Sequence, residues 1–145
     1  MTNRQALSIS LEDTPALDDV RFVQQGLQTY NLLYAPDDGY KPLTLFLRSV
    51  DGTIFGGLLG ETYWGWLHIS ILWLDETARR QGYGERLLAL AEQEAVRRGC
   101  HAAHLDTMSF QALPFYEKNG YTVFGVLNDL PVGHSRYFMK KALGA

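Results

Sequence analysis

The 145-residue sequence predicts one α/β (α+β) domain, residues 1–145, with a mixed central β-sheet of about six to seven strands flanked by helices. Two observations predict this fold class. Short alternating or apolar runs bounded by turn residues indicate strands, and longer runs with apolar residues at helical spacing indicate helices. The strands come first as hairpins and later alternate with helices. Hairpins pair antiparallel strands and β-α-β crossovers pair parallel ones, so we expect a mixed sheet.

The first half of the chain predicts a strand, a helix and a hairpin. Residues 6–11 show a short alternation and form a candidate first strand. Residues 20–33 predict a helix, because five side chains recur at helical spacing: Val20, Val23, Leu27, Tyr30 and Leu33. Residues 43–50 and 53–62 predict two strands joined by a turn at Asp51 and Gly52. Three glycines in the second of these strands indicate a bulge or a close approach of other atoms: Gly56, Gly57 and Gly60.

The second half alternates strands with helices. A Trp-Gly-Trp turn at 64–66 leads into residues 67–74, a mostly apolar run that is typical of a central strand. A helix follows from near Gly84 and ends at Gly99, with an apolar face formed by Leu87, Leu88, Ala91 and Ala95. Residues 102–107 predict a strand and residues 110–118 a short helix. Residues 121–127 and 136–141 predict the last two strands.

Composition and charge argue against several classes of protein. The net charge of −3 disfavours a nucleic-acid partner or an anionic membrane surface, both of which favour a basic protein. No apolar run approaches the ~20 residues that a membrane helix needs, and the first residues lack a signal-peptide pattern. Cys100 is the only cysteine, so no intramolecular disulfide or thiolate metal cluster can form. We therefore expect a cytoplasmic protein with no metal, no nucleic acid and no membrane partner.

The turn at residues 79–84, Arg-Arg-Gln-Gly-Tyr-Gly, carries the main chemical signal. It joins the expected central strand to a long helix, where main-chain N–H groups point outward and the helix dipole adds positive potential. Two glycines let the backbone curl around an anion, and Arg79, Arg80 and Arg86 add positive charge. The pattern predicts a cradle for a phosphate or diphosphate. The alternative is a glycine-rich helix start with exposed arginines.

Two common phosphate sites do not fit this turn. A Walker A loop needs Lys and then Ser or Thr after the last glycine, and Glu85 and Arg86 stand there instead. The dinucleotide fingerprint needs a third glycine at the position of Leu87. Sites for ATP, GTP and NAD are therefore disfavoured.

Two segments together resemble the signature of one family. The pattern Arg79-x-x-Gly82-x-Gly84 after a strand closely resembles the signature motif of the GNAT superfamily of N-acetyltransferases. Residues 112–121, Ala-Leu-Pro-Phe-Tyr-Glu-Lys-Asn-Gly-Tyr, look like that family's Ala-x-x-hydrophobic-Tyr-Glu-Lys-x-Gly-Phe/Tyr segment. The resemblance extends over about residues 43–141. It implies a single GNAT-like domain whose sheet splays apart between two parallel strands, near the ends at Leu74 and Asp106.

The resemblance also implies acetyl-CoA as the co-substrate. Members of the family hold the CoA diphosphate on the glycine turn and the pantetheine arm along the preceding strand. That implies a donor site of eleven residues: Leu72, Trp73, Leu74, Arg79, Arg80, Gln81, Gly82, Tyr83, Gly84, Glu85 and Ser109. Ser109 departs from the family pattern, because many members carry an asparagine there that contacts CoA.

Tyr116 matches the family's tyrosine beside the sulfur, which implies that it protonates the departing thiolate. A phenol with a pKa of about 10 can do this, because an alkyl thiol has a similar or slightly lower pKa. The alternative is that Tyr116 packs in the core of a short helix. Direct transfer also needs a base for the amine, for which the candidates are Glu61, His68, Asp106 and His134. Cys100 has no base beside it in the sequence, which disfavours an acyl-cysteine step.

We therefore expect transfer of an acetyl group from acetyl-CoA directly to a primary amine of a small-molecule acceptor. Aromatic residues are candidates for lining the acceptor pocket or for packing: Tyr30, Tyr34, Tyr40, Trp64, Trp66 and Phe110. A loop over residues 129–134 is a candidate cover for the acceptor. A homodimer is common in the family. The alternatives are a non-catalytic acyl-CoA-binding sensor, a protein N-acetyltransferase and a nucleotide hydrolase.

Overall fold

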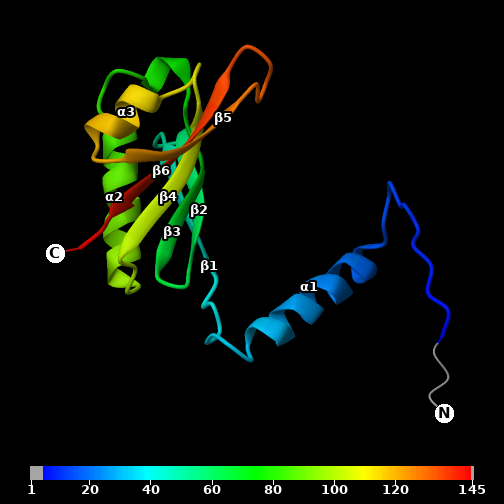
Figure 1. Cartoon of the computed structure of the whole chain (residues 1–145). Coiled ribbons are helices and arrows are strands. Elements are labelled where there is room, and N and C mark those ends of the chain that lie inside the picture. Colours follow the sequence, from blue (N-terminus) through cyan, green and yellow to red (C-terminus); the bar gives the residue numbers. More distant parts are fainter. Residues whose placement is uncertain (1–4, 145) are drawn as a thin grey trace. The chain divides into compact units, whose positions relative to one another are not determined.

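The computed structural model describes residues 5–144, which divide into a short N-terminal unit, up to Asp37, and a larger unit from Asp38. The N-terminal unit contains helix α1 (Leu17–Asn31). The larger unit contains, in order, β1 (Lys41–Arg48), β2 (Ile54–Tyr63), β3 (Trp66–Leu74), a 3-10 turn (Glu76–Ala78), α2 (Tyr83–Arg97), β4 (Ala102–Met108), α3 (Leu113–Lys118), β5 (Thr122–Asn128) and β6 (Ser135–Ala142) (Figure 1). None of the helices among residues 5–144 combines the length and apolarity needed to cross a bilayer.

The six strands form one sheet in the order β1-β2-β3-β4-β6-β5. The pairs β1–β2 and β2–β3 are antiparallel hairpins, and β3 and β4 are parallel neighbours joined through α2. Strand β6 then lies between β4 and β5 and is antiparallel to both. The expectation of a mixed sheet of six to seven strands is thus confirmed.

The strand expected at residues 6–11 is wrong, because these residues have no regular secondary structure. A strand persists only when its N–H and C=O groups are paired along a neighbour, and a short alternation supplies no such partner. The short helix expected from residue 110 begins instead at Leu113, where Pro114 occupies the first turn. Proline suits that position because it lacks the N–H that a first turn leaves unpaired.

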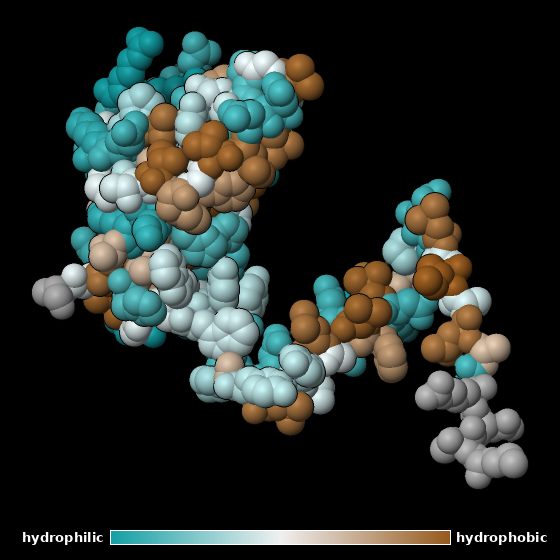
Figure 2. All heavy atoms as spheres, viewed as in Figure 1, coloured by the Kyte–Doolittle hydropathy of each residue, from teal (hydrophilic) through white to brown (hydrophobic). Residues whose placement is uncertain are grey.

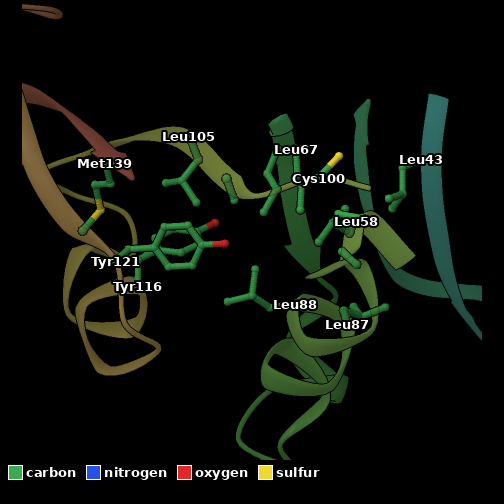
Figure 3. Packing of buried hydrophobic residues seen from close by; sticks show 14 residues of the cluster. Leu43, Leu58, Leu67, Leu87, Leu88, Cys100, Leu105, Tyr116, Tyr121 and Met139 are labelled. Carbon is green, nitrogen blue, oxygen red and sulfur yellow. The ribbon is translucent and has the colours of Figure 1, made fainter. Parts of the chain in front are cut away.

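The core lies between α2 and one face of the sheet. Leu58, Leu67 and Leu105 point from the strands toward Leu88 of α2 (Figure 3). All four are buried, as is Ala91 of α2. Burying such side chains stabilises the fold by roughly 1.5–3 kcal/mol each. Because successive strand residues point to opposite faces, their neighbours point away from α2. We call this opposite surface the far face; it carries Glu61, Tyr63, His68, His104 and Asp106.

Helix α1 confirms the predicted amphipathic helix, within two to three residues at each end. It follows Pro15 and carries Asp18 and Asp19 in its first turn, where carboxylates favour the positive end of the helix dipole. Figure 2 shows hydrophobic residues gathered along it. Phe22 and Leu27 are among its exposed hydrophobic side chains. None of its residues is buried.

The glycines of β2 have the role that the sequence predicted. The β2–β3 register shifts between Leu59 and Gly60, which is a bulge. A Cβ atom at Gly60 would overlap the main-chain oxygen of His68, and one at Gly57 would lie 2.8 Å from the oxygen of Leu45. Neighbouring backbones therefore approach too closely for any other residue.

We predict that Gly60→Ala destabilises the protein by about 1–3 kcal/mol, because either the bulge or the β2–β3 pairing must shift. Gly125→Ala in β5 is the matched control, since its Cβ would meet only Phe138 at an ordinary 3.9 Å. Chemical denaturation of both variants measures the difference. Equal stability of the two variants would show that the close approach at Gly60 is unimportant.

Candidate active site

The parallel pairing of β3 and β4 stops early and leaves a gap in the sheet. The two strands pair from Trp66 with Ala102 to Ile69 with Leu105 and no further. Beyond that point β3 continues to Leu74 and β4 to Met108. The splay implied near these strand ends is confirmed. A hollow of about 280 Å³ occupies the gap and is lined by residues of both strands and of the α3 region: Ile69, Ser70, Ile71, Leu72, Trp73, Asp106, Thr107, Gln111, Ala112 and Tyr116.

A tight turn connects the end of β3 to α2. Arg80 and Gly82 both adopt positive φ angles, 63° and 81°, which turns successive amides toward one side. Helix α2 begins at Tyr83 and has no side-chain cap, since its N-cap residue is Gly82. Helical hydrogen bonding begins with the main-chain N–H of Arg86, which donates to the Gly82 oxygen at 3.1 Å. The preceding N–H groups of the first turn, through Glu85, are those that a helix leaves without internal partners.

This turn has the electrostatics of an anion site. The N-terminal end of α2 carries positive potential from its dipole, and Arg79 and Arg80 add full charges. Arg79 is positioned by a 3.0 Å hydrogen bond from its Nε to the main-chain oxygen of Leu74. That bond keeps the guanidinium at the end of β3.

A second hollow, of about 510 Å³, runs between the end of β3, the start of α2 and α3. It brings together six residues of the expected donor and catalytic sites: Leu72, Trp73, Leu74, Arg79, Gly84 and Tyr116. Four further residues line it: Phe110, Gln111, Ala112 and Phe115. The remaining residues of the turn lie in the 79–84 loop or the first turn of α2 beside this hollow: Arg80, Gln81, Gly82, Tyr83 and Glu85.

Tyr116 lies where the two hollows meet. Its ring is buried in the core beside Tyr121 (Figure 3). It packs edge-on against Phe115 and Tyr121, with centroids 5.2 and 5.9 Å apart. Burial, with a smaller contribution from the negative charge of Asp106, raises the pKa of Tyr116 to about 12. The phenol is therefore protonated near neutral pH and can donate a hydrogen bond or a proton.

Ser109 is engaged with the β5–β6 loop. Its hydroxyl accepts a hydrogen bond from the Ser135 N–H at 3.1 Å and lies 3.3 Å from His134 Nδ1. Ser109 is not among the residues that line either hollow, whereas the next residues, Phe110 and Gln111, are. His134 in turn packs edge-on against Phe110, with centroids 4.8 Å apart. These contacts fix the loop beside the donor hollow.

Two of the four candidate bases lie together on the far face. Glu61 Oε1 and His68 Nδ1 are 2.6 Å apart, and both side chains are mostly buried. Asp106 faces Arg136 instead, with Oδ1 and Nε 3.5 Å apart. Arg136 Nε is buried without a hydrogen-bond partner, so this contact is an ion pair rather than a hydrogen bond.

Sequence reasoning missed His104, Gln111 and Phe115. His104 stacks on His68, and its position in the predicted strand at 102–107 was the available signal. Gln111 accepts a hydrogen bond from the Met108 N–H at 2.8 Å and so shapes the end of β4. No local pattern marks it. The aromatic residues expected around the acceptor do not lie together. Trp64 and Trp66 line a hollow on the far face, and Phe110 lines the donor hollow. Tyr30 belongs to the N-terminal unit.

Comparison with known proteins decides the family. The model described as the acetyltransferase (GNAT) family matches residues 9–121. This chain belongs to the GNAT acetyltransferase family. It is thus an acetyl-CoA-dependent acetyltransferase, as its two motifs implied.

Two curated relatives are similar to this acetyltransferase over much of its length. An acetyltransferase of Agrobacterium fabrum is 36% identical over 135 residues, which cover 93% of this chain and 98% of the relative. The blasticidin-S acetyltransferase of Streptomyces morookaense is 40% identical over 93 residues, 63% of this chain and 68% of the relative. A crystal structure of an Agrobacterium tumefaciens acetyltransferase, 35% identical, superposes with a TM-score of 0.88 over 94% of this chain and all of that one.

Cys100 of this acetyltransferase is poorly suited to a covalent step. It is a free thiol, buried in the core behind α2, and burial raises its pKa. A nucleophilic cysteine needs the opposite shift, because the thiolate is the reactive form. Among residues 5–144, no cluster of three His, Cys, Asp or Glu side chains is arranged to hold a metal ion.

The raised pKa of Tyr116 predicts a specific loss of stability in alkali. The native state keeps this proton up to about pH 12, while an unfolded tyrosine releases it near pH 10. The contribution of this proton to the free energy of unfolding is present below pH 10 and is lost as the pH rises toward 12. The free energy of unfolding then falls by up to about 1.4 kcal/mol per pH unit. Tyr116→Phe should reduce that slope, as measured by urea unfolding between pH 9 and 12. An unchanged slope would contradict the shift.

Proposed function

We propose that this acetyltransferase moves the acetyl group of acetyl-CoA directly onto a primary amine of a small molecule. One observation carries the proposal: the Tyr116 phenol lies at the junction of the donor hollow and the gap between β3 and β4. A thioester bound at that junction can be approached by the Tyr116 hydroxyl from one side and by an amine from the other. The cradle of residues 79–84 lies at the opposite end of β3 from its paired segment.

The donor site follows from this placement. The diphosphate of CoA is held by the amides of the turn and the start of α2, and Arg79 and Arg80 offset its charge. The pantetheine arm lies along the free edge of β3, where residues 72–74 have main-chain groups beyond the last pair with β4. Ser109 takes a smaller part than the other residues, because its hydroxyl is already engaged with Ser135 and His134.

The chemical step is a direct displacement at the thioester carbonyl. The neutral amine nitrogen attacks the carbonyl carbon, a C–N bond forms and the C–S bond breaks. The amine loses one proton to a base, and the sulfur takes one proton from the Tyr116 hydroxyl. The thiolate forms in the same desolvated hollow, which raises the pKa of the thiol as well as that of Tyr116 and so offsets the weaker acidity of the buried phenol.

The acceptor class is supported by the far face and by one relative. A far-face hollow of about 530 Å³ is lined mainly by ring side chains: Tyr63, Trp64, Trp66, His104, Phe124 and Lys140. Such walls suit a small organic molecule with a flat or cationic group. The blasticidin-S acetyltransferase, 40% identical over the shared segment, is named for a small-molecule acceptor.

A panel of amines tests the proposal by release of free CoA, followed with a thiol reagent. The panel contains blasticidin S, spermidine, free lysine and a peptide with a free N-terminus. Release with a small amine supports the proposal, and preference for the peptide favours a protein N-acetyltransferase. Binding of acetyl-CoA by calorimetry with no release for any amine would instead identify a sensor.

We predict that Tyr116→Phe lowers kcat by about 10²–10⁴-fold, the usual contribution of a general acid. The affinity for acetyl-CoA should be nearly unchanged, because the ring and its packing remain. Steady-state kinetics with the best amine and calorimetry with acetyl-CoA give the two values. Equal turnover of the variant and the wild type would remove the role of Tyr116 as proton donor.

We further predict that Gly82→Val abolishes measurable CoA binding. A side chain there crowds the diphosphate, and the φ of 81° is unfavourable for a β-branched residue. Gly52→Val is the matched control, since Gly52 also has a positive φ, 89°, and open surroundings but lies in the β1–β2 turn. Calorimetric binding of CoA should survive in the control. Loss of binding in both variants would indicate a general effect on folding.

A further inference from the structure

The far face carries a pair of histidines held in register by the sheet. His68 of β3 and His104 of β4 are direct partners in the parallel ladder, and Glu61 of β2 is the partner of His68 on its other side. Their neighbours Leu67 and Ala103 are buried toward α2, so these three side chains share the far face. The sheet register therefore places Glu61, His68 and His104 in one row across three strands.

The contacts within this row are short and directional. His68 Nδ1 lies 2.6 Å from Glu61 Oε1, and the rings of His68 and His104 stack with centroids 4.6 Å apart at 22°. The Tyr63 hydroxyl lies 3.0 Å from His104 Nε2. Each polar atom named here has one partner, so the two rings have fixed orientations.

These partners determine where the free lone pair lies. A carboxylate only accepts hydrogen bonds, so His68 donates from Nδ1 and its neutral form carries the lone pair on Nε2. The carboxylate also stabilises the imidazolium that forms when Nε2 takes a proton. Nε2 of His104, by contrast, already has the Tyr63 hydroxyl as its hydrogen-bond partner. His68 is thus the ring that is arranged to accept a proton.

The pair lies at the closed end of the gap between β3 and β4. Ile69 and Leu105 form the last pair of the ladder, and the next residues along the two strands, Ser70 and Asp106, line the gap together with Tyr116. One step along the same face of a strand is roughly 7 Å, so one or two water molecules can bridge it. Tyr116 approaches the gap from the core side, and the histidine pair approaches from the far face.

We propose that His68 is the base that removes the proton from the attacking amine, with Glu61 as its positioning residue and His104 as its stacked partner. This inference rests on the proposed function. The proton lost by nitrogen as the C–N bond forms passes, directly or through water, to Nε2 of His68 and then to solvent. Tyr116 recovers from solvent the proton that it gives to sulfur, so each turnover leaves the enzyme unchanged.

The other candidate bases are engaged elsewhere. Asp106 forms its ion pair with Arg136, and His134 is held by Ser109 and Phe110. The sheet surrounds the histidine pair with charges of both signs. The groups facing it are Glu61 and Tyr63 on β2, Asp106 on β4, and Arg136 and Lys140 on β6.

His104 is arranged to stay neutral beside His68. Burial and the neighbouring His68 both lower the pKa of His104, and Glu61 and Asp106 only partly oppose them. Protonation of His68 therefore keeps His104 neutral, since two adjacent cations repel. The expected consequence is one acidic limb in the pH–rate profile.

Kinetics with blasticidin S, or with the best amine of the panel, test the assignment. His68→Gln should lower kcat by about 10²–10⁴-fold, leave the KM for acetyl-CoA unchanged and remove the acidic limb. Glu61→Gln, which is isosteric, should lower kcat less and move the acidic limb to lower pH, because the imidazolium loses its carboxylate. His101→Gln, at an exposed histidine, is the control and should match the wild type.

Titration by NMR gives a readout that needs no acceptor. The ring signals of His68 and His104 should move together in the wild type, and Glu61→Gln should lower the midpoint assigned to His68. Independent titrations that Glu61→Gln does not alter would overturn the inference. Turnover of His68→Gln at the wild-type rate with the acidic limb intact would also overturn it and would leave the proposed function standing. Absence of turnover in the wild type for every amine would contradict the proposed function itself.

Discussion

The site depends on the point at which β3 and β4 stop pairing. Four residue pairs hold the two parallel strands together, and both strands then continue without each other. A full ladder would bury the main-chain groups of residues 72–74 in hydrogen bonds to β4. Because the ladder ends, those groups and the space beside them remain available to a ligand. The gap also connects the two faces of the sheet, which are separated elsewhere by paired strands.

The elements around the gap are held by packing that is independent of any ligand. Helix α2 is fixed against β1, β2 and β3 by its apolar face, which places its N-terminus at the end of β3. Helix α3 is fixed through Tyr121, whose hydroxyl donates to Glu92 of α2 at 3.0 Å, while Lys141 pairs with the same carboxylate at 2.7 Å. The turn at residues 79–84 and Tyr116 are therefore held in place by the protein alone, which in the proposed function limits the entropy lost on binding.

Much of the fold and part of the site could be predicted from local patterns. The hairpin at Asp51 and Gly52, the helix ending at Gly99 and the glycines of β2 all depend on neighbouring residues, and each was found. The candidate strand at 6–11 failed because strand formation depends on a partner that the local sequence does not contain. The engagement of Ser109 with Ser135 was likewise unpredictable, since it joins residues 26 apart.

The sequence by itself determined the order of the elements from α1 onward, the glycine turn at residues 79–84 and the family, because each is written in short, contiguous motifs. Only the tertiary structure decided which side chains meet. Glu61, His68 and His104 come from three strands, and the sheet register places them in one row. Register follows from the packing of whole strands against α2, so a single strand pattern can assign a residue to a face but cannot name its neighbour.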